Sequence, residues 1–209
     1  DDLHWADRAT LPLLAHAELD LGAPGGDADP RHYDAYLRSR PCAWEDAAIA
    51  LLIRLCRETG CAVHVVHLSS ADSLPQIRAA KAEGLPVTAD VSINSLHLTD
   101  MDIGYFNSAL RLTPPVRQQR DREALQAALA DGTIDIIVSS HDPQDVDTKR
   151  LPFAEAADGA IGLETLFCAA LRLYHGGHIG LSRLLECISM RPAQIFGLPG
   201  GSLRAGQPA

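Results

Sequence analysis

The sequence has no apolar run long enough to cross a membrane and no excess of positive charge. Its longest apolar stretches, such as residues 47–53, are far shorter than the roughly 20 residues that a membrane-spanning helix needs. The first residues, DDLHWADRAT, also lack the basic and apolar regions of a secretory signal. A formal net charge of -9 at pH 7 disfavours nucleic acid and anionic membranes as partners. We therefore expect a cytoplasmic protein whose partner is neither nucleic acid nor a membrane.

Cysteine pairs, internal repeats and low-complexity tracts are also missing. The 5 cysteines are odd in number, lie mostly within helix or strand patterns, and have no zinc-finger spacing. We interpret them as reduced packing residues rather than as a disulfide framework. What is present is an ordinary globular composition, 46% hydrophobic and 22% charged, in 209 residues. This provides enough apolar material for a sizeable core, as one domain or as part of one.

Strand and helix patterns alternate along the chain. We expect strands at 12–18, 61–70, 85–93 and 133–140, and helices at 43–60, 71–84, 120–132, 161–175 and 180–190. Such alternation is typical of parallel βα units, and four units make about half of an eight-stranded α/β barrel. Both ends of the chain look cut, which suggests a segment of a longer protein. In the long loop at 141–160, Lys149 and Arg150 could form a mobile lid or an ordinary solvated pair.

Imidazoles follow three of the expected strands. His16 lies near the end of the first strand, His67 ends the second, and His141 follows the fourth with Asp142 beside it. Parallel strands of a barrel bring their C-terminal residues to one mouth, so His16 and His67 could share a metal ion, and neutral imidazole suits zinc. His64 is the competing ligand. It lies three residues before His67 and faces the opposite side of the strand, which favours a structural role.

Four blocks of sequence together resemble a known family. They are PLLAHAE, VHVVHLSSADSLPQIRAAKAEGLPVTADV, LTPPVRQQRDREALQAALADGTIDIIVSSHDP and KRLPFAEAADGAIGLET. These blocks are similar to the class I dihydroorotases of the cyclic amidohydrolase superfamily. Allantoinases and dihydropyrimidinases share several of them, and RHYDAYLRSRP at 31–41 is similar to allantoinases. The resemblance implies a distorted TIM (β/α)8 barrel, with its C-terminal half at 1–197 and the start of a connection toward a small β domain at 198–209.

The resemblance also implies a chemistry. Dihydroorotases hydrolyse dihydroorotate reversibly to carbamoyl-aspartate in pyrimidine biosynthesis, with one or two zinc ions. By this resemblance His16 and His67 match two metal ligands. The HxH pair, the bridging carboxylate or carboxylated lysine, and the arginine for the substrate carboxylate would lie upstream. This segment alone could not assemble such a metal site.

The block after the fourth strand departs from the family pattern. An ungapped alignment over 134–165 places Ser140 where the family has its metal-contacting, proton-shuttling aspartate. A neutral hydroxyl is a poor metal ligand and a poor base. Asp142 lies two residues further, on the same side of an extended segment and displaced by about 6 to 7 Å. With His141 assisting, it could take over proton transfer if the backbone pulls back; otherwise it caps a turn at Pro143.

Three substrate-binding positions also carry altered polar groups. The asparagine of the family's NPP block is here Thr113, the second histidine of DHAPH is Gln144, and the PHH after the third strand is Asn94 followed by Ser95. A different substrate such as allantoin, weak activity and no activity are all compatible with these changes.

Two hypotheses follow from these departures. The first is a zinc-dependent cyclic amidohydrolase most like dihydroorotase. The second is a catalytically inactive subunit that scaffolds aspartate transcarbamoylase. The expected partners are a small cyclic amide, a second copy of the chain and, for the scaffold, the transcarbamoylase. Bound zinc in the full-length protein distinguishes the two hypotheses.

Overall fold

A parallel sheet of four short strands organises the computed structural model, which describes residues 12–21, 33–104, 107–202 and 204–206. The strands are β1 (Leu13–His16), β2 (Val63–Val66), β3 (Val87–Ser92) and β4 (Ile136–Val138). They lie side by side in the order β1-β2-β3-β4, and every neighbouring pair is parallel. Parallel neighbours require a crossover between them, and here each crossover carries a helix. The α/β class with a parallel sheet, expected from the alternating patterns, is confirmed.

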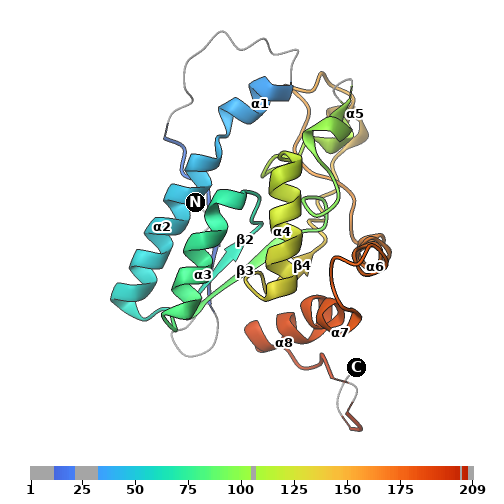
Figure 1. The fold of residues 1–209 in the computed structure, drawn as a ribbon. Coiled ribbons are helices and arrows are strands. Elements are labelled where there is room, and N and C mark those ends of the chain that lie inside the picture. Colours follow the sequence, from blue (N-terminus) through green and yellow to red (C-terminus); the bar gives the residue numbers. More distant parts are fainter. Residues whose placement is uncertain (1–11, 22–32, 105–106, 203, 207–209) are drawn as a thin grey trace.

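Helices cover the sheet on one side and gather beside β4 (Figure 1). The α-helices are α1 (Tyr33–Ser39), α2 (Cys42–Thr59), α3 (Leu74–Ala82), α4 (Gln119–Asp131), α5 (Val146–Lys149), α6 (Leu166–His175), α7 (Leu181–Leu185) and α8 (Arg191–Ile195). Short 3-10 turns are η1 (Ala71–Ser73), η2 (Asp100–Ile103) and η3 (Ser108–Leu110), and η4 (Glu186–Met190) is a π turn. Within the described ranges, no helix has the length and hydrophobicity needed to span a bilayer.

The main core lies between the sheet and the helices. Val65 and Ala89 of the strands and Ile49 and Ile77 of α2 and α3 have no exposed surface. The apolar run of β4 (Ile136–Val138), with Ile136 and Ile137 both buried, is typical of a parallel strand covered on both faces. All five cysteines are free, and Cys56 is among those packed in this core. The prediction that the cysteines form no disulfide framework is confirmed.

A buried charge cluster lies at the N-terminal end of β4. The Asp135 carboxylate accepts hydrogen bonds from Lys81 Nζ at 2.6 Å, Arg191 Nη2 at 2.8 Å and the Ala89 backbone N–H at 2.9 Å. Two cations and an amide compensate the desolvation of this carboxylate, which is 4% exposed. The cluster joins α3, β3 and α8 at the end of the sheet where strands begin.

Two helix boundaries differ from the sequence expectations. The helix expected at 161–175 begins only at Leu166, because the preceding backbone N–H groups of Gly162 and Leu163 are held by the His141 ring. The helix expected at 180–190 is divided into α7, η4 and α8. Pro192 has no N–H for an i to i-4 bond, and the wider π turn stands directly before α8.

His97 connects the segment after β3 to α6 and should make the fold acid-sensitive. Its Nε2 lies 2.9 Å from the Ala169 carbonyl oxygen, and burial lowers its pKa from the ordinary 6.5. Below about pH 6.5 the unfolded state therefore binds protons more readily than the folded state, so stability falls on acidification and is level at higher pH. We expect the parent to lose more stability than His97→Gln between about pH 7.5 and about pH 5.5 in urea unfolding. Equal losses would contradict this role.

Candidate active site

Two imidazoles and a hydroxyl meet at the C-terminal ends of the strands. His16 is the last residue of β1 and His67 directly follows β2. Their ring centroids are 6.0 Å apart, and the rings are nearly perpendicular at 82°. Ser140, two residues after β4, places its Oγ 3.2 Å from His67 Nε2. Three side chains from three separate strand ends are thus brought to one place.

Left-handed backbone directs two of these side chains. His67 has φ 58° and Ser140 has φ 46°, a region that non-glycine residues other than Asn and Asp seldom occupy. Unusual backbone of this kind persists only where surrounding contacts enforce it, and it concentrates at functional sites. Each of the two strands therefore turns sharply at its end, and the two turns carry His67 and Ser140 toward each other.

A buried carboxylate on β3 holds His67 in this conformation. Asp90 accepts the His67 backbone N–H at 2.7 Å through Oδ1 and lies 3.1 Å from His64 Nε2 through Oδ2. His64 has no exposed surface, and its Nδ1 lies 2.7 Å from Thr88 Oγ1. With Nε2–H donating to Asp90, Nδ1 accepts the Thr88 hydroxyl proton. Both nitrogens of His64 are used inside the fold, which agrees with its expected structural role.

The turn after His67 is fixed from behind by Glu45 of α2. This buried carboxylate accepts the backbone N–H groups of Ser69 at 3.1 Å and Ser70 at 3.0 Å, and the Ser69 hydroxyl at 2.5 Å. Burial raises the pKa of Glu45, although the serine hydrogen bonds oppose this shift. Sequence analysis missed this residue. The available signal was an acidic residue four positions before Ile49 on the buried face of α2.

The electrostatics favour neutral imidazole at His16. Partial burial lowers its pKa most, and the neighbouring His67 lowers it further, while Glu18 acts in the opposite direction. Neutral imidazole is the form that binds a metal ion. No group of three or more metal-ligating side chains occurs among the residues that the structure describes. A catalytic zinc needs three protein ligands, so His16 and His67 fit as two members of a larger ligand set.

His141 and Asp142 lie in the next turn, where the His141 ring and the Asp142 backbone bond to residues 160–163. His141 Nδ1 accepts backbone N–H groups from Gly162 at 3.1 Å and Leu163 at 3.2 Å, which leaves the proton of the neutral ring on Nε2. The Asp142 backbone N–H donates to the Ala160 carbonyl at 2.9 Å, and its side chain is exposed. The extended backbone that was expected from Ser140 to Asp142 is interrupted, because Ser140 has a left-handed φ of 46°. The catalytic role of Asp142 stays a prediction.

Gly159 allows the following loop to approach this turn closely. Its φ is 126°, and a Cβ there would lie 2.7 Å from Asp142 Oδ2 and 2.9 Å from Gln144 Nε2. Only glycine fits such a position without moving the neighbouring chain. The half-buried Gln144 is therefore placed at this contact, and its expected role in substrate binding stays a prediction.

Thr113 and Asn94 differ in how their polar atoms are used. Thr113 Oγ1 donates its proton to Asp158 Oδ2 at 2.8 Å and accepts from Arg40 Nη1 at 3.1 Å. Asn94, two residues after β3, has a buried Nδ2 with no hydrogen-bond partner in the described part of the chain. The Nδ2 donor of Asn94 is thus without a partner in the described part of the chain, whereas the Thr113 hydroxyl already donates its proton to Asp158.

Comparison with known proteins finds relatives that are similar over almost the whole chain. No family model matches the chain. Over 214 residues it is 39% identical to a protein named dihydroorotase from Anaeromyxobacter dehalogenans, and over 210 residues 36% identical to a dihydroorotase from Syntrophotalea carbinolica. Each comparison covers 99% of this chain and 49% of the relative. The chain is therefore similar to dihydroorotases along almost all of its own length. It spans about half the length of the curated relatives that it matches.

Solved structures with a similar fold are TIM-barrel amidohydrolases. An L-hydantoinase (dihydropyrimidinase) from Arthrobacter aurescens superposes with a TM-score of 0.84 at 30% identity, over 94% of this chain and 46% of that one. A dihydropyrimidinase from Brevibacillus agri superposes with a TM-score of 0.82 at 24% identity over the same shares, which supports the fold alone. The predicted barrel type is confirmed.

Lys149 anchors the long loop after β4. Its ammonium donates to the carbonyls of Ala157 and Gly159, both at 2.9 Å, and lies 3.4 Å from the Arg111 carbonyl. This geometry supports neither of the two hypotheses for Lys149, a mobile lid or a solvated pair. We expect Lys149→Met to accelerate backbone hydrogen exchange at 157–160 at least about tenfold, because the carbonyls lose a charged donor. Arg150→Met, at the exposed neighbouring position, should change it little; equal effects would contradict the anchoring role.

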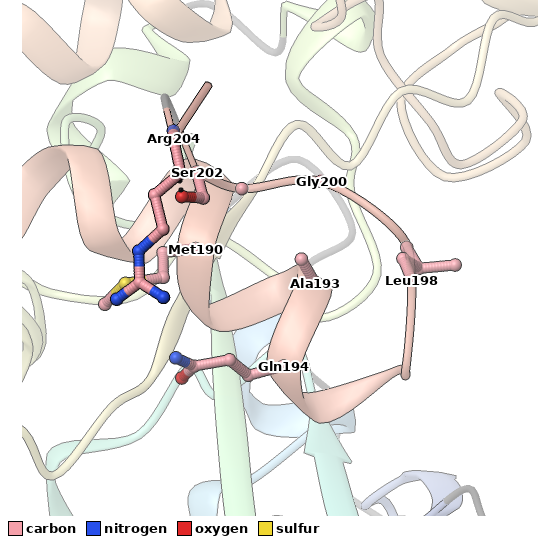
Figure 2. A pocket seen from close by; sticks show the side chains of 8 residues that line it. Met190, Ala193, Gln194, Leu198, Gly200, Ser202 and Arg204 are labelled. Carbon is pink, nitrogen blue, oxygen red and sulfur yellow. Dashed lines mark hydrogen bonds between the residues drawn. The ribbon is translucent and has the colours of Figure 1, made fainter. Parts of the chain in front are cut away.

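A separate hollow lies at the C-terminal end of the described chain. The hollow has a volume of about 420 Å³, and Figure 2 shows side chains that line it, among them Met190, Gln194, Leu198 and Arg204. Neither histidine of the imidazole pair lines it, and Arg204 is its single titratable side chain. We therefore assign the chemistry to the strand ends. The connection expected from 198 onward toward a small β domain stays a prediction.

Proposed function

We propose that the protein containing this chain is a zinc-dependent cyclic amidohydrolase of the dihydroorotase type, which hydrolyses a ring C–N bond of dihydroorotate. The observation that carries the proposal is the His16–His67 pair, with ring centroids 6.0 Å apart at the ends of adjacent strands. Similarity to proteins named dihydroorotase over 99% of the chain supports the substrate class. Such a reaction belongs to pyrimidine synthesis.

His16 and His67 would hold the metal ion together with ligands from the rest of the protein. A zinc ion bound there supplies Lewis-acid activation of the ring amide and lowers the pKa of an attacking water. Asp90 orients His67 through its backbone N–H. Asn94, whose buried Nδ2 has no partner among the described residues, is kept as a proposed substrate-binding residue. Transfer of the water proton to the leaving ring nitrogen falls to the Asp142 carboxylate, assisted by His141.

Zinc content and dihydroorotate hydrolysis of the complete protein test this function together. We expect about one or two zinc ions per protein and measurable turnover. A His175→Ala variant is the matched control, because His175 is an exposed histidine at the end of α6. It should retain both zinc and turnover. Absence of zinc, or absence of turnover toward any cyclic amide, would reject the proposal.

Ser140 supports a second candidate function. The Ser140 hydroxyl lies 3.2 Å from His67 Nε2, and by the resemblance the family carries its catalytic aspartate at this position. A catalytically inactive subunit that scaffolds aspartate transcarbamoylase tolerates such a change. This function predicts co-purification with transcarbamoylase and no bound zinc. A panel that includes allantoin tests the third reading, an amidohydrolase with another cyclic amide as substrate.

A further inference from the structure

Arg117 is a buried arginine that contacts the turn after β2 and lies on the segment that carries Thr113. It is 8% exposed. Its Nε donates to Ser69 Oγ at 3.1 Å, and its Nη1 donates to the Arg40 carbonyl at 2.5 Å. Ser69 follows His67 by two residues, and Thr113 precedes Arg117 by four. One guanidinium therefore connects the turn of a candidate metal ligand to the segment of a candidate substrate-binding residue.

Ser69 lies between two buried groups of opposite charge. Its hydroxyl accepts the hydrogen bond from Arg117 and gives its single proton to Glu45 Oε2 at 2.5 Å, while its backbone N–H donates to Glu45 Oε1 at 3.1 Å. Glu45 is 5% exposed, so both charges depend on such contacts to offset their desolvation. A shift of the turn would leave a buried charge short of a hydrogen bond, which is costly. The two charges thus fix the position of Ser69.

The segment between Thr113 and Arg117 is stiff. Pro114 and Pro115 are both buried, and each proline ring fixes its own φ. The Arg117 carbonyl accepts the Asp100 backbone N–H at 3.0 Å, which holds the end of the segment. Thr113 therefore has little freedom to move independently of Arg117.

We propose that Arg117 is a positioning residue that, through Ser69 and Glu45, holds the turn of His67 at a fixed position relative to Thr113. Groups behind a metal ligand maintain its orientation, and their loss typically lowers metal affinity about 10- to 100-fold. Asp90 fixes the start of this turn through the His67 N–H, and Arg117 fixes its far side. The inference rests on the proposed function for its metal and adds a link between metal binding and substrate binding.

Hydrogen exchange of the zinc-free complete protein tests the link without the metal. Arg117→Met should accelerate backbone exchange at 67–70 at least about tenfold, because the turn loses a charged donor. Arg183→Met is the matched control. Arg183 is also partly buried and donates to the carbonyls of Leu129 at 3.2 Å and Ile134 at 2.7 Å, at the end of the sheet where strands begin. This control should leave exchange at 67–70 unchanged.

Zinc affinity, measured by competition with a chelator, tests the consequence for the metal ligand. Arg117→Met should raise the dissociation constant of zinc about 10- to 100-fold. Arg117→Lys should recover part of this loss, because an ammonium keeps the charge but not the planar fork that serves two acceptors. Ser69→Ala should act like Arg117→Met. Ser73→Ala removes another hydroxyl that contacts Glu45, at 3.1 Å, and should leave zinc affinity unchanged.

The outcomes separate this inference from the proposed function. Equal effects of Arg117→Met and Arg183→Met, or of Ser69→Ala and Ser73→Ala, would indicate general destabilisation and overturn the positioning role. Faster exchange with unchanged zinc affinity would overturn it as well. If Arg117→Met does not fold, the two serine variants give the answer. If the parent binds no zinc, the proposed function fails, while exchange at 67–70 that is accelerated only by Arg117→Met and Ser69→Ala preserves the link.

Discussion

Ser140→Asp should raise dihydroorotate turnover of the complete protein by about 10²- to 10⁴-fold, the usual contribution of a positioned general acid or base. The Ser140 hydroxyl already lies 3.2 Å from His67 Nε2, so a carboxylate at this position would lie at the imidazole pair. The backbone suits the change, because φ at this residue is 46° and aspartate occupies that region more readily than serine. Initial rates with dihydroorotate, normalised to zinc content, measure the effect.

Ser140→Asn is the matched control for this gain. Asparagine has the same shape and the same tolerance of left-handed backbone, but it has no basic carboxylate. We expect no increase in turnover from it. Asp142→Asn assigns the proton-transfer group, because it should abolish turnover of the parent but be tolerated when Ser140→Asp is also present. Equal gains from the aspartate and asparagine variants would contradict the argument.

His67→Asn and His64→Ala should separate metal binding from folding. His67→Asn keeps a residue that accepts φ 58° but removes the imidazole, so zinc content and turnover should be lost while the fold remains. His64→Ala should instead lower the free energy of unfolding by about 3 kcal/mol, because it opens a buried cavity and removes one hydrogen bond each from Asp90 and Thr88. Zinc analysis and urea unfolding measure the two effects.

A reversed pattern would exchange the roles of these two histidines. If His64→Ala removed zinc from a folded protein and His67→Asn retained it, His64 would be the ligand that competes with His67. His178→Ala provides a reference for both measurements, since this exposed histidine lies beyond α6. It should change neither zinc content nor the unfolding midpoint.

The sequence was sufficient where local signals determine structure. The apolar run at 134–138 predicted the buried strand β4, and Gly60 and Gly132 predicted the ends of α2 and α4, where both adopt left-handed C-caps. The histidines at strand ends were placed correctly because parallel strands deliver their ends to one edge. These features depend on residues close together in the chain.

The remaining features depend on contacts between distant segments. Glu45 contacts Ser69, 24 positions away in the sequence, and Arg40 contacts Thr113, 73 positions away. No local sequence pattern predicts either contact. The position of Asp142 was misjudged for a different reason. Side chains alternate between the two faces of a strand only while the backbone is extended. The left-handed φ of Ser140 interrupts the extended backbone one residue before His141. A single dihedral angle therefore redirects every side chain that follows it.

The buried Asp135 cluster and the left-handed turn at His67 lie at opposite ends of the sheet. Substitutions at well-separated sites without shared partners combine nearly additively. Lys81 and Arg191 contact Asp135 and belong to the stabilising end, while Ser140 belongs to the reactive end. Directed evolution of this scaffold can therefore screen the two ends of the sheet as independent libraries, one for thermal stability and one for turnover. The best substitutions from the two libraries can then be combined.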